Sequence, residues 1–142
     1  SPSFFQVLSY HTRKMLSNLS EKKLTEMEIF TSALYNALGV GHKNAQTRRE
    51  LCKRLGCSDR MLRKGIEILR IDYAILSRDD GKGYYLPEIT DAGRADARRW
   101  ARRQERRVEA IRTAQAGALK FATTRREPKG VYGQLSMFRD GG

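Results

Sequence analysis

The sequence predicts a mainly α-helical fold that carries one small β-hairpin and ends in a long basic helix. Three observations indicate this fold. Apolar residues recur three or four positions apart along most of the chain, which is the spacing of one helix face. Two short apolar runs flank a glycine-containing loop near residue 80, as in a hairpin. Beyond Pro87 the helical spacing resumes and arginine becomes dense.

The N-terminal residues 1–22 are predicted to form a helix or an arm. Their apolar residues lie at roughly helical spacing: Phe5, Leu8, Met15, Leu16 and Leu19. Such a segment either packs on the domain that follows or pairs with a second subunit. The sequence leaves both roles open.

A first core helix is predicted to begin near Thr25. Thr25 and Glu28 fit a capping box, in which each side chain accepts a hydrogen bond from the other residue's backbone N–H. Gly39 and Gly41 are placed to end the helix. Its buried face is predicted to consist of Ile29, Phe30, Ala33, Leu34, Ala37 and Leu38.

Two more helices are predicted on either side of a tight turn. Thr47 and Glu50 fit a second capping box, and Gly56 ends that helix. Ser58 can cap the next helix, with Asp59 in the first turn, where the helix dipole favours an acid. The inward residues are Leu51 and Leu55 in one helix and Leu62, Ile66 and Leu69 in the other. The outward residues are Arg60, Arg63, Lys64, Glu67 and Arg70.

A hairpin and a long helix complete the predicted elements. Strands are expected over residues 74–77 and 83–86, joined by the loop 78–82. A helix is expected from residue 91 to about residue 122. Its apolar residues form a thin stripe: Ala97, Trp100, Ala101, Val108, Ile111, Ala118 and Leu119.

Two helices, a tight turn, a third helix and a two-stranded wing, in this order, define a winged helix-turn-helix. We therefore predict a winged helix-turn-helix domain, with a three-helix core plus a two-stranded wing, over residues 23–89. The arm precedes this domain, and a basic helical extension over residues 90–122 follows it. Residues 123–142 have few apolar groups to offset the entropy of ordering, so we expect a flexible tail.

The charge of the chain favours a polyanionic partner. Lys and Arg number 28 and Asp and Glu 16, so the formal net charge is +12. Cations that neutralise DNA phosphates release condensed counterions, which drives binding. The alternatives are a solvated cationic surface and an acidic membrane. The uneven distribution of the cations argues against the first, and no basic helix with a face rich in Trp, Phe and Leu supports the second.

The fold predicts where duplex DNA would bind. The third helix of this fold fits the major groove, and the wing meets the neighbouring backbone or minor groove. The candidates are Arg60, Arg63 and Lys64 on that helix, Arg78 and Lys82 in the wing, and Thr47 and Arg48 at a helix N-terminus that could hold a phosphate. The extension adds Arg99, Arg102, Arg103 and Arg106.

The arginine-rich extension has two interpretations. It either contacts the DNA backbone or is a solvated helix with ion pairs one turn apart. Glu105 could pair with Arg102, and Glu109 with Arg106 or Arg112. Two acids cannot neutralise so many arginines, and this favours backbone contact.

Residues 41–88, about a third of the chain, resemble a group of helix-turn-helix proteins of bacteriophages and prophages. The resemblance rests on Gly41, Asn44-Ala45, Leu51, Leu55-Gly56-Cys57, Ser58-Asp59-Arg60, Arg63-Lys64, Ile66-Glu67, Leu69-Arg70, Ile75 and Gly83-Tyr84-Tyr85. It implies a role in phage DNA replication or regulation. Gly65 and the short turn at 70–73 depart from the pattern. In mid-helix, Gly65 costs about 1 kcal/mol relative to Ala, and we can attribute it only to close packing.

Residues 133–138 resemble the peptide by which bacterial replication and repair proteins bind the sliding clamp. That peptide has a Gln, an aliphatic residue, a small or acidic residue, and then Leu-Phe. Here the matching residues are Gln134, Leu135, Met137 and Phe138, with Met137 in place of the usual Leu. The resemblance implies apolar anchors in a preformed pocket and a hydrogen bond from the glutamine amide. The alternative is that these residues fold back onto the domain.

Nothing in the sequence predicts an enzyme, a metal site or a cofactor. No phosphate-binding GxxxxGK[ST] motif and no nucleophile beside a base is found. Cys52 and Cys57 do not form a CxxC pair, and His11 and His42 do not complete a zinc site. We expect free thiols in the reducing cytoplasm of a bacterial host cell, with no signal peptide and no membrane span.

Three functions remain open for the chain. The first is a DNA-binding replication factor that contacts the clamp. The second is a sequence-specific transcriptional regulator, and the third is a protein-interaction adaptor. A homodimer formed through Trp100, Val108 and Ile111 is a further option, which repulsion between arginines would oppose unless DNA neutralises them.

Overall fold

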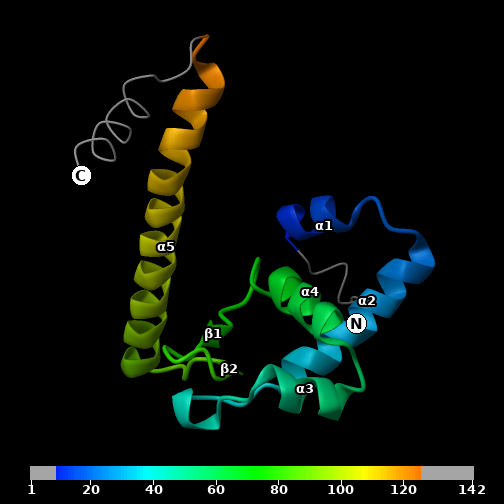
Figure 1. The fold of residues 1–142 in the computed structure, drawn as a ribbon. Coiled ribbons are helices and arrows are strands. Elements are labelled where there is room, and N and C mark those ends of the chain that lie inside the picture. Colours follow the sequence, from blue (N-terminus) through cyan, green and yellow to red (C-terminus); the bar gives the residue numbers. More distant parts are fainter. Residues whose placement is uncertain (1–8, 126–142) are drawn as a thin grey trace. The chain divides into compact units, whose positions relative to one another are not determined.

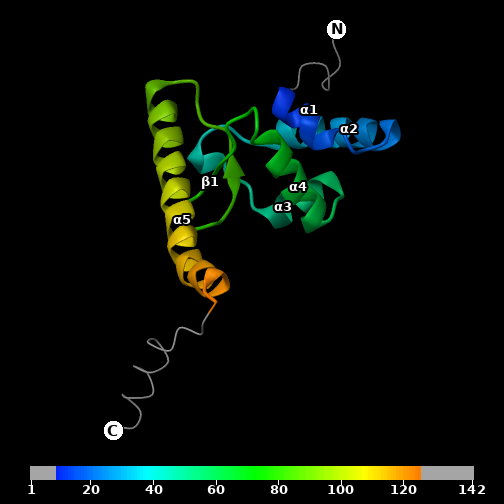
Figure 2. The same ribbon diagram turned by 90° about the horizontal axis from the view of Figure 1, so that it is seen from above.

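The structure is a computed structural model that describes residues 9–125 of the chain (Figure 1 and Figure 2). It is mainly α-helical, with a two-stranded antiparallel hairpin and a long C-terminal helix, as predicted. The elements are α1 (Tyr10–Leu16), α2 (Glu21–Ala37), the 3-10 turn η2 (His42–Asn44), α3 (Arg48–Leu55), α4 (Asp59–Leu69), β1 (Leu76–Ser77), β2 (Tyr84–Tyr85) and α5 (Asp91–Thr123). The chain divides into two compact units, Ser1–Trp100 and Ala101–Gly142, which are described separately.

The predicted start of the first core helix is wrong. Helix α2 begins at Glu21 and is capped by Ser20, whose hydroxyl accepts a hydrogen bond from the backbone N–H of Lys23. Thr25 lies inside the helix and donates to the Glu21 carbonyl at 3.0 Å. Ser20 is as good a cap as Thr25, and the residues after it favour a helix, so the helix starts more than one turn earlier.

The buried face of α2 is only partly the predicted one. Leu34, Ala37 and Leu38 are buried, but Ile29 is 66% exposed and Ala33 is also exposed. Thr31 is buried instead, and its hydroxyl donates to the Met27 carbonyl at 2.8 Å. This bond satisfies the polar group of a threonine inside a helix, so the residue can take a core position.

Both caps predicted for the next two helices are confirmed. Thr47 and Glu50 form the reciprocal capping box of α3, with both hydrogen bonds at 3.1 Å. Gly56 ends α3 in the left-handed conformation, with φ of 63°. Ser58 caps α4, and α4 packs against both α2 and α3. Four of the five predicted inward residues of these helices are buried: Leu51, Leu62, Ile66 and Leu69.

Close packing explains the glycine inside α4. A Cβ atom on Gly65 would lie 2.7 Å from Cε1 of Phe30 and 2.8 Å from Cδ2 of Leu34. Gly65 therefore lets α2 and α4 approach each other at the centre of the core.

The hairpin is shorter than predicted and is extended by the segment between α2 and α3. Leu76 pairs with Tyr85 and Ser77 with Tyr84. Single bridges then join Val40 to Leu86 and Gln46 to Tyr84. Residues on both sides of η2 therefore hold the second strand in place.

The N-terminal helix packs on the domain. Leu16 of α1 and Ile68 of α4 form a small buried cluster, with Met15, Leu19, Leu24 and Met27 around it. Thr12 is buried, and its hydroxyl donates to the Asp72 carboxylate at 2.8 Å. The described residues of the arm therefore pack on the domain that follows, which is one of the two roles predicted for it.

The first part of α5 is attached to the hairpin. The Tyr85 hydroxyl donates to the Asp96 carboxylate at 2.7 Å, and Trp100 Nε1 donates to the Ser77 hydroxyl at 2.9 Å. At the start of the helix, the Gly93 N–H donates to the Thr90 hydroxyl. These bonds fix Asp91–Trp100 on the domain. No helix among residues 9–125 is long and apolar enough to cross a membrane.

Candidate nucleic-acid interface

The outer face of α4 carries the cations predicted for it. Arg60, Arg63 and Lys64 are all exposed, whereas Leu62 and Ile66, on the opposite face, are buried. The Nε of Arg63 lies 3.0 Å from the Asp59 carboxylate, and the Nζ of Lys64 lies 3.7 Å from that of Glu67. Within residues 9–125 the side chain of Arg60 has no ion pair or hydrogen bond. Arg60 is therefore free to contact a ligand.

The prediction that Arg70 lies on this outer face is wrong. Its Nε donates to the Ile75 carbonyl at 2.9 Å. Its guanidinium carbon lies 5.4 Å from the centre of the Tyr84 ring and 4.8 Å from that of Trp100. Arg70 therefore joins the hairpin to α5 through cation–π contacts and has a structural role.

An open groove runs between α4 and the start of α2. One wall is the outer face of α4, including Arg60, Arg63 and Lys64. The other wall contains Asn18, Ser20 and Lys23, so it adds a further cation beside those of α4. Sequence reasoning missed this wall because the helix was predicted to begin at Thr25.

The start of α3 contributes one of its two predicted residues to the surface. The Thr47 hydroxyl is engaged in the capping box, and the Glu50 carboxylate accepts from the Thr47 N–H. Arg48 is exposed, and its Nε lies 3.4 Å from the Asp59 carboxylate. Asp59 thus pairs with Arg48 from α3 and with Arg63 from α4, and it holds both guanidinium groups at the junction of the two helices.

The hairpin loop carries both cations predicted for it, Arg78 and Lys82, on either side of Asp80. The guanidinium of Arg78 lies 3.0 Å from the Asp80 carboxylate, which also accepts from the Lys82 backbone N–H at 2.9 Å. That backbone hydrogen bond, more than any other contact, lowers the pKa of Asp80 below its ordinary value. Asp80 is therefore ionised at neutral pH. The side chain of Lys82 is exposed, and its charge is a further, smaller cause of the lowered pKa of Asp80.

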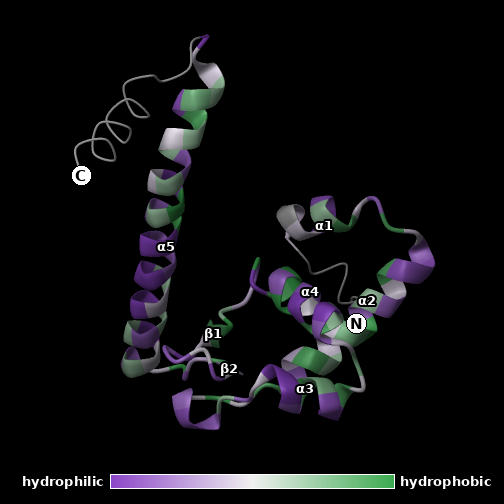
Figure 3. Cartoon of the chain, in the orientation of Figure 1, coloured by the Kyte–Doolittle hydropathy of each residue, from purple (hydrophilic) through white to green (hydrophobic). Residues whose placement is uncertain are grey.

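The predicted arginines of α5 lie in both units. Arg99, in the first unit, lies 3.6 Å from the Asp96 carboxylate. Arg102 and Arg106 are exposed, and Arg103 is half-buried. Within the described part of the chain no ion pair joins Glu105 to Arg102, or Glu109 to Arg106 or Arg112. Figure 3 shows that hydrophilic residues dominate the middle of α5.

The two cysteines lie near each other, Cys52 in α3 and Cys57 in the connection between α3 and α4. Both are free and half-buried. Burial, and next the neighbouring Cys52, raise the pKa of Cys57 above its ordinary value, so this thiol is neutral at pH 7. Among the residues that the structure describes, no group of His, Cys, Asp and Glu could hold a metal ion.

The clamp-like peptide is not part of the described structure. Gln134, Leu135, Met137 and Phe138 lie outside residues 9–125. Comparison of the chain with protein-family models, with curated proteins and with solved structures finds no match.

Proposed function

We propose that residues 20–100 form a winged helix-turn-helix domain that binds duplex DNA. Helices α3 and α4 are joined by residues 56–58 and pack together, α2 packs on α4, and the hairpin follows α4 in the chain. This order and these contacts support the arrangement. The observation that carries the proposal is the exposed cationic face of α4, which lies opposite its buried face.

In this proposal α4 enters the major groove, and its first turn reaches the base edges. Arg60 lies in that turn and has no competing partner among the described residues, so we assign it to base contact. Arg63 and Arg48 share Asp59, which orients both guanidinium groups toward neighbouring phosphates. Lys82, in the hairpin loop, meets the adjacent backbone. The arginines of α5 add phosphate contacts that do not depend on sequence.

The first prediction concerns α4. Arg60→Ala with Lys64→Ala should weaken DNA binding without unfolding the domain, because both side chains are exposed. If Arg60 contacts guanine, its loss costs about 1–3 kcal/mol and relaxes specificity at one position. Selection of DNA sites by the purified variant, followed by sequencing, measures both effects.

The matched control removes two exposed cations from other helices. Lys14→Ala with Lys22→Ala makes the same change in net charge at exposed positions of α1 and α2. This control should retain the specificity of the unmodified chain. If the α4 variant and the control have equal affinity and equal specificity, α4 does not face DNA and the proposal is wrong.

We also propose that the tail binds the bacterial sliding clamp, which would place the protein in DNA replication. The support is the sequence of residues 134–138. A peptide of residues 130–142 should bind purified clamp with micromolar affinity, since Leu135 and Phe138 can each contribute about 1.5–3 kcal/mol before ordering costs. Isothermal titration measures this affinity.

The control peptide carries Gln134→Ala and Phe138→Ala. Equal affinities of the two peptides would exclude the clamp and favour a transcriptional regulator that uses the same DNA-binding face. A chain with no salt-dependent DNA binding at all would instead be a protein-interaction adaptor.

A further inference from the structure

The second unit of the chain carries a stripe of apolar residues and glutamines along α5, with two exposed apolar side chains at its centre. Val108 is 45% exposed and Ile111 is 58% exposed. The stripe continues at alternating steps of three and four residues, which is the heptad spacing of a coiled-coil seam. Its six members are Ala101, Gln104, Val108, Ile111, Gln115 and Ala118.

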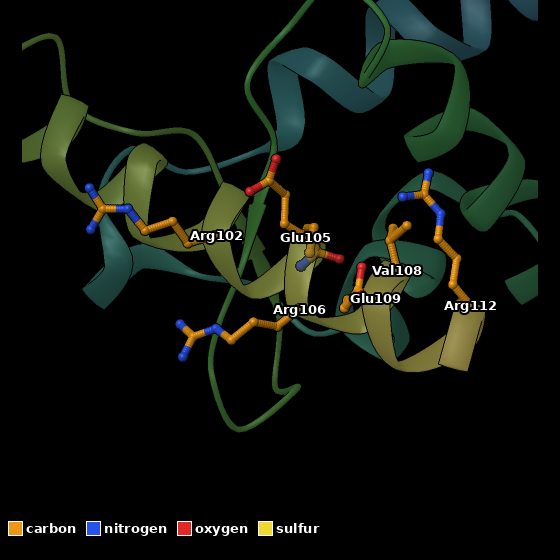
Figure 4. Close-up of a pocket in the computed structure, with 7 residues that line it drawn as sticks. Arg102, Glu105, Arg106, Val108, Glu109 and Arg112 are labelled. Carbon is orange, nitrogen blue, oxygen red and sulfur yellow. The ribbon is translucent and has the colours of Figure 1, made fainter. Parts of the chain in front are cut away.

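The arginines proposed to contact DNA lie off this seam. Taking Ala101 and Val108 as heptad position a, Arg102 and Arg103 occupy b and c, and Arg106 occupies f, all on the outer side of a paired helix. Figure 4 shows the side chains of Glu105, Val108 and Arg112 projecting to one side of α5, and that of Arg106 pointing away from them. Repulsion between these arginines therefore does not prevent two such helices from meeting.

We propose that α5 pairs with α5 of a second copy of this chain in antiparallel orientation. The seam is self-complementary in this orientation when it is centred between Val108 and Ile111. Each Val108 then faces Ile111 of the second copy, each Gln104 faces Gln115, and each Ala101 faces Ala118. Each residue therefore faces one of the same chemical type across the interface. The glutamine side chains can hydrogen-bond to each other, and the alanines allow the two helices to approach closely.

The flanking charges select the antiparallel orientation. Glu105 and Arg112 both occupy position e, and e positions face each other in an antiparallel pair, so two Glu105–Arg112 ion pairs border the seam. In a parallel pair, position g faces position e, and Arg107 would lie beside Arg112 of the second copy. The flanking charges therefore attract each other in the antiparallel pair and repel each other in the parallel pair.

The partner helix that fits this seam is α5 of a second copy. One stripe supplies both residues of every layer and both residues of each ion pair. With only two apolar layers at its centre, the seam should give a dimer of micromolar affinity. This inference does not rest on DNA binding, and its test contains no DNA.

Sedimentation velocity of the full chain over a range of concentrations tests the dimer. Val108→Lys with Ile111→Lys should weaken dimerisation by at least about 100-fold, because each copy then places one charge in each of the two apolar layers. The control Ala110→Lys with Thr113→Lys makes the same charge change at the outer positions c and f, and it should dimerise like the unmodified chain. Circular dichroism checks that both variants keep their helix content.

A charge swap tests the register. Glu105→Arg alone and Arg112→Glu alone should each weaken the dimer about tenfold, and the double variant should restore it. Arg112→Glu is the diagnostic change, because it lowers the net positive charge and would strengthen a dimer limited only by repulsion. A chain that stays monomeric up to sub-millimolar concentration, or seam and outer variants that behave alike, would overturn the dimer. Failure of the double variant to restore it would overturn the antiparallel register.

Discussion

Replacing Arg99, Arg102, Arg103 and Arg106 together with Gln is expected to lower DNA affinity by roughly two to three orders of magnitude at moderate salt. Each arginine that neutralises a phosphate releases counterions on binding. The slope of log affinity against log salt should therefore flatten by about 0.9 for each lost contact. The loss should be nearly the same for every DNA sequence, because phosphates carry no sequence information.

Changing the same four residues to Lys gives the control for this prediction. Lysine keeps the charge, so the salt slope of the Lys variant should stay close to that of the unmodified chain. Binding titrations at several salt concentrations measure both variants. An unchanged slope in the Gln variant would mean that this part of α5 does not meet DNA phosphates, whatever α4 does.

The α5 and α4 variants distinguish contacts that hold the DNA backbone from contacts that recognise its sequence. Loss of the α5 arginines should reduce affinity and leave the preferred site unchanged, whereas loss of Arg60 should change the preferred site. The seam of α5 and its outer arginines occupy different faces of the helix. Pairing through the seam therefore leaves the exposed side chains of Arg102 and Arg106 on the face that would meet phosphates.

Features set by neighbouring residues could be predicted from the sequence. The capping box of Thr47 and Glu50, the cap at Ser58 and the glycine end of α3 all depend on hydrogen bonds or backbone conformation within a few positions. The extent of α5 followed from its periodicity in the same way. The cations of the candidate site were found because the inward stripe of α4 assigns the remaining positions to the surface.

Features set by distant contacts could not be predicted. Ser20 and Thr25 are both good caps, and the choice between them involves Leu24 and Met27, which pack around Ile68 of α4. Arg70 looks like an outward cation until Trp100 and Tyr84 come close enough to stack with it. No local signal reports these contacts, so Lys23 and its wall of the groove were missed as well.

Gly93→Ala is expected to destabilise the first unit by about 3 kcal/mol, although Ala favours a helix over Gly by about 1 kcal/mol. A Cβ atom at this position would overlap the Glu88 carbonyl oxygen. Glu88 cannot easily retreat, because the nearby Leu86 N–H donates to Gly39 at 2.8 Å and the Leu86 carbonyl accepts from Gly41 at 2.8 Å. Relief of the overlap must therefore shift either the hairpin or the start of α5.

Urea unfolding followed by the fluorescence of Trp100 measures this cost, because Trp100 is the chain's single tryptophan and is held against Ser77 in the folded domain. Gly117→Ala is the matched control in the same helix. A Cβ atom there meets no atom within 4 Å, so the substitution should raise helix content and leave the Trp100 transition in place. The signs of the two effects should be opposite because local propensity acts alone at Gly117, while at Gly93 it is outweighed by main-chain overlap. A Gly93→Ala chain as stable as the unmodified one would show that residues 88 and 93 do not approach this closely, and the attachment of α5 to the hairpin would then need a different explanation.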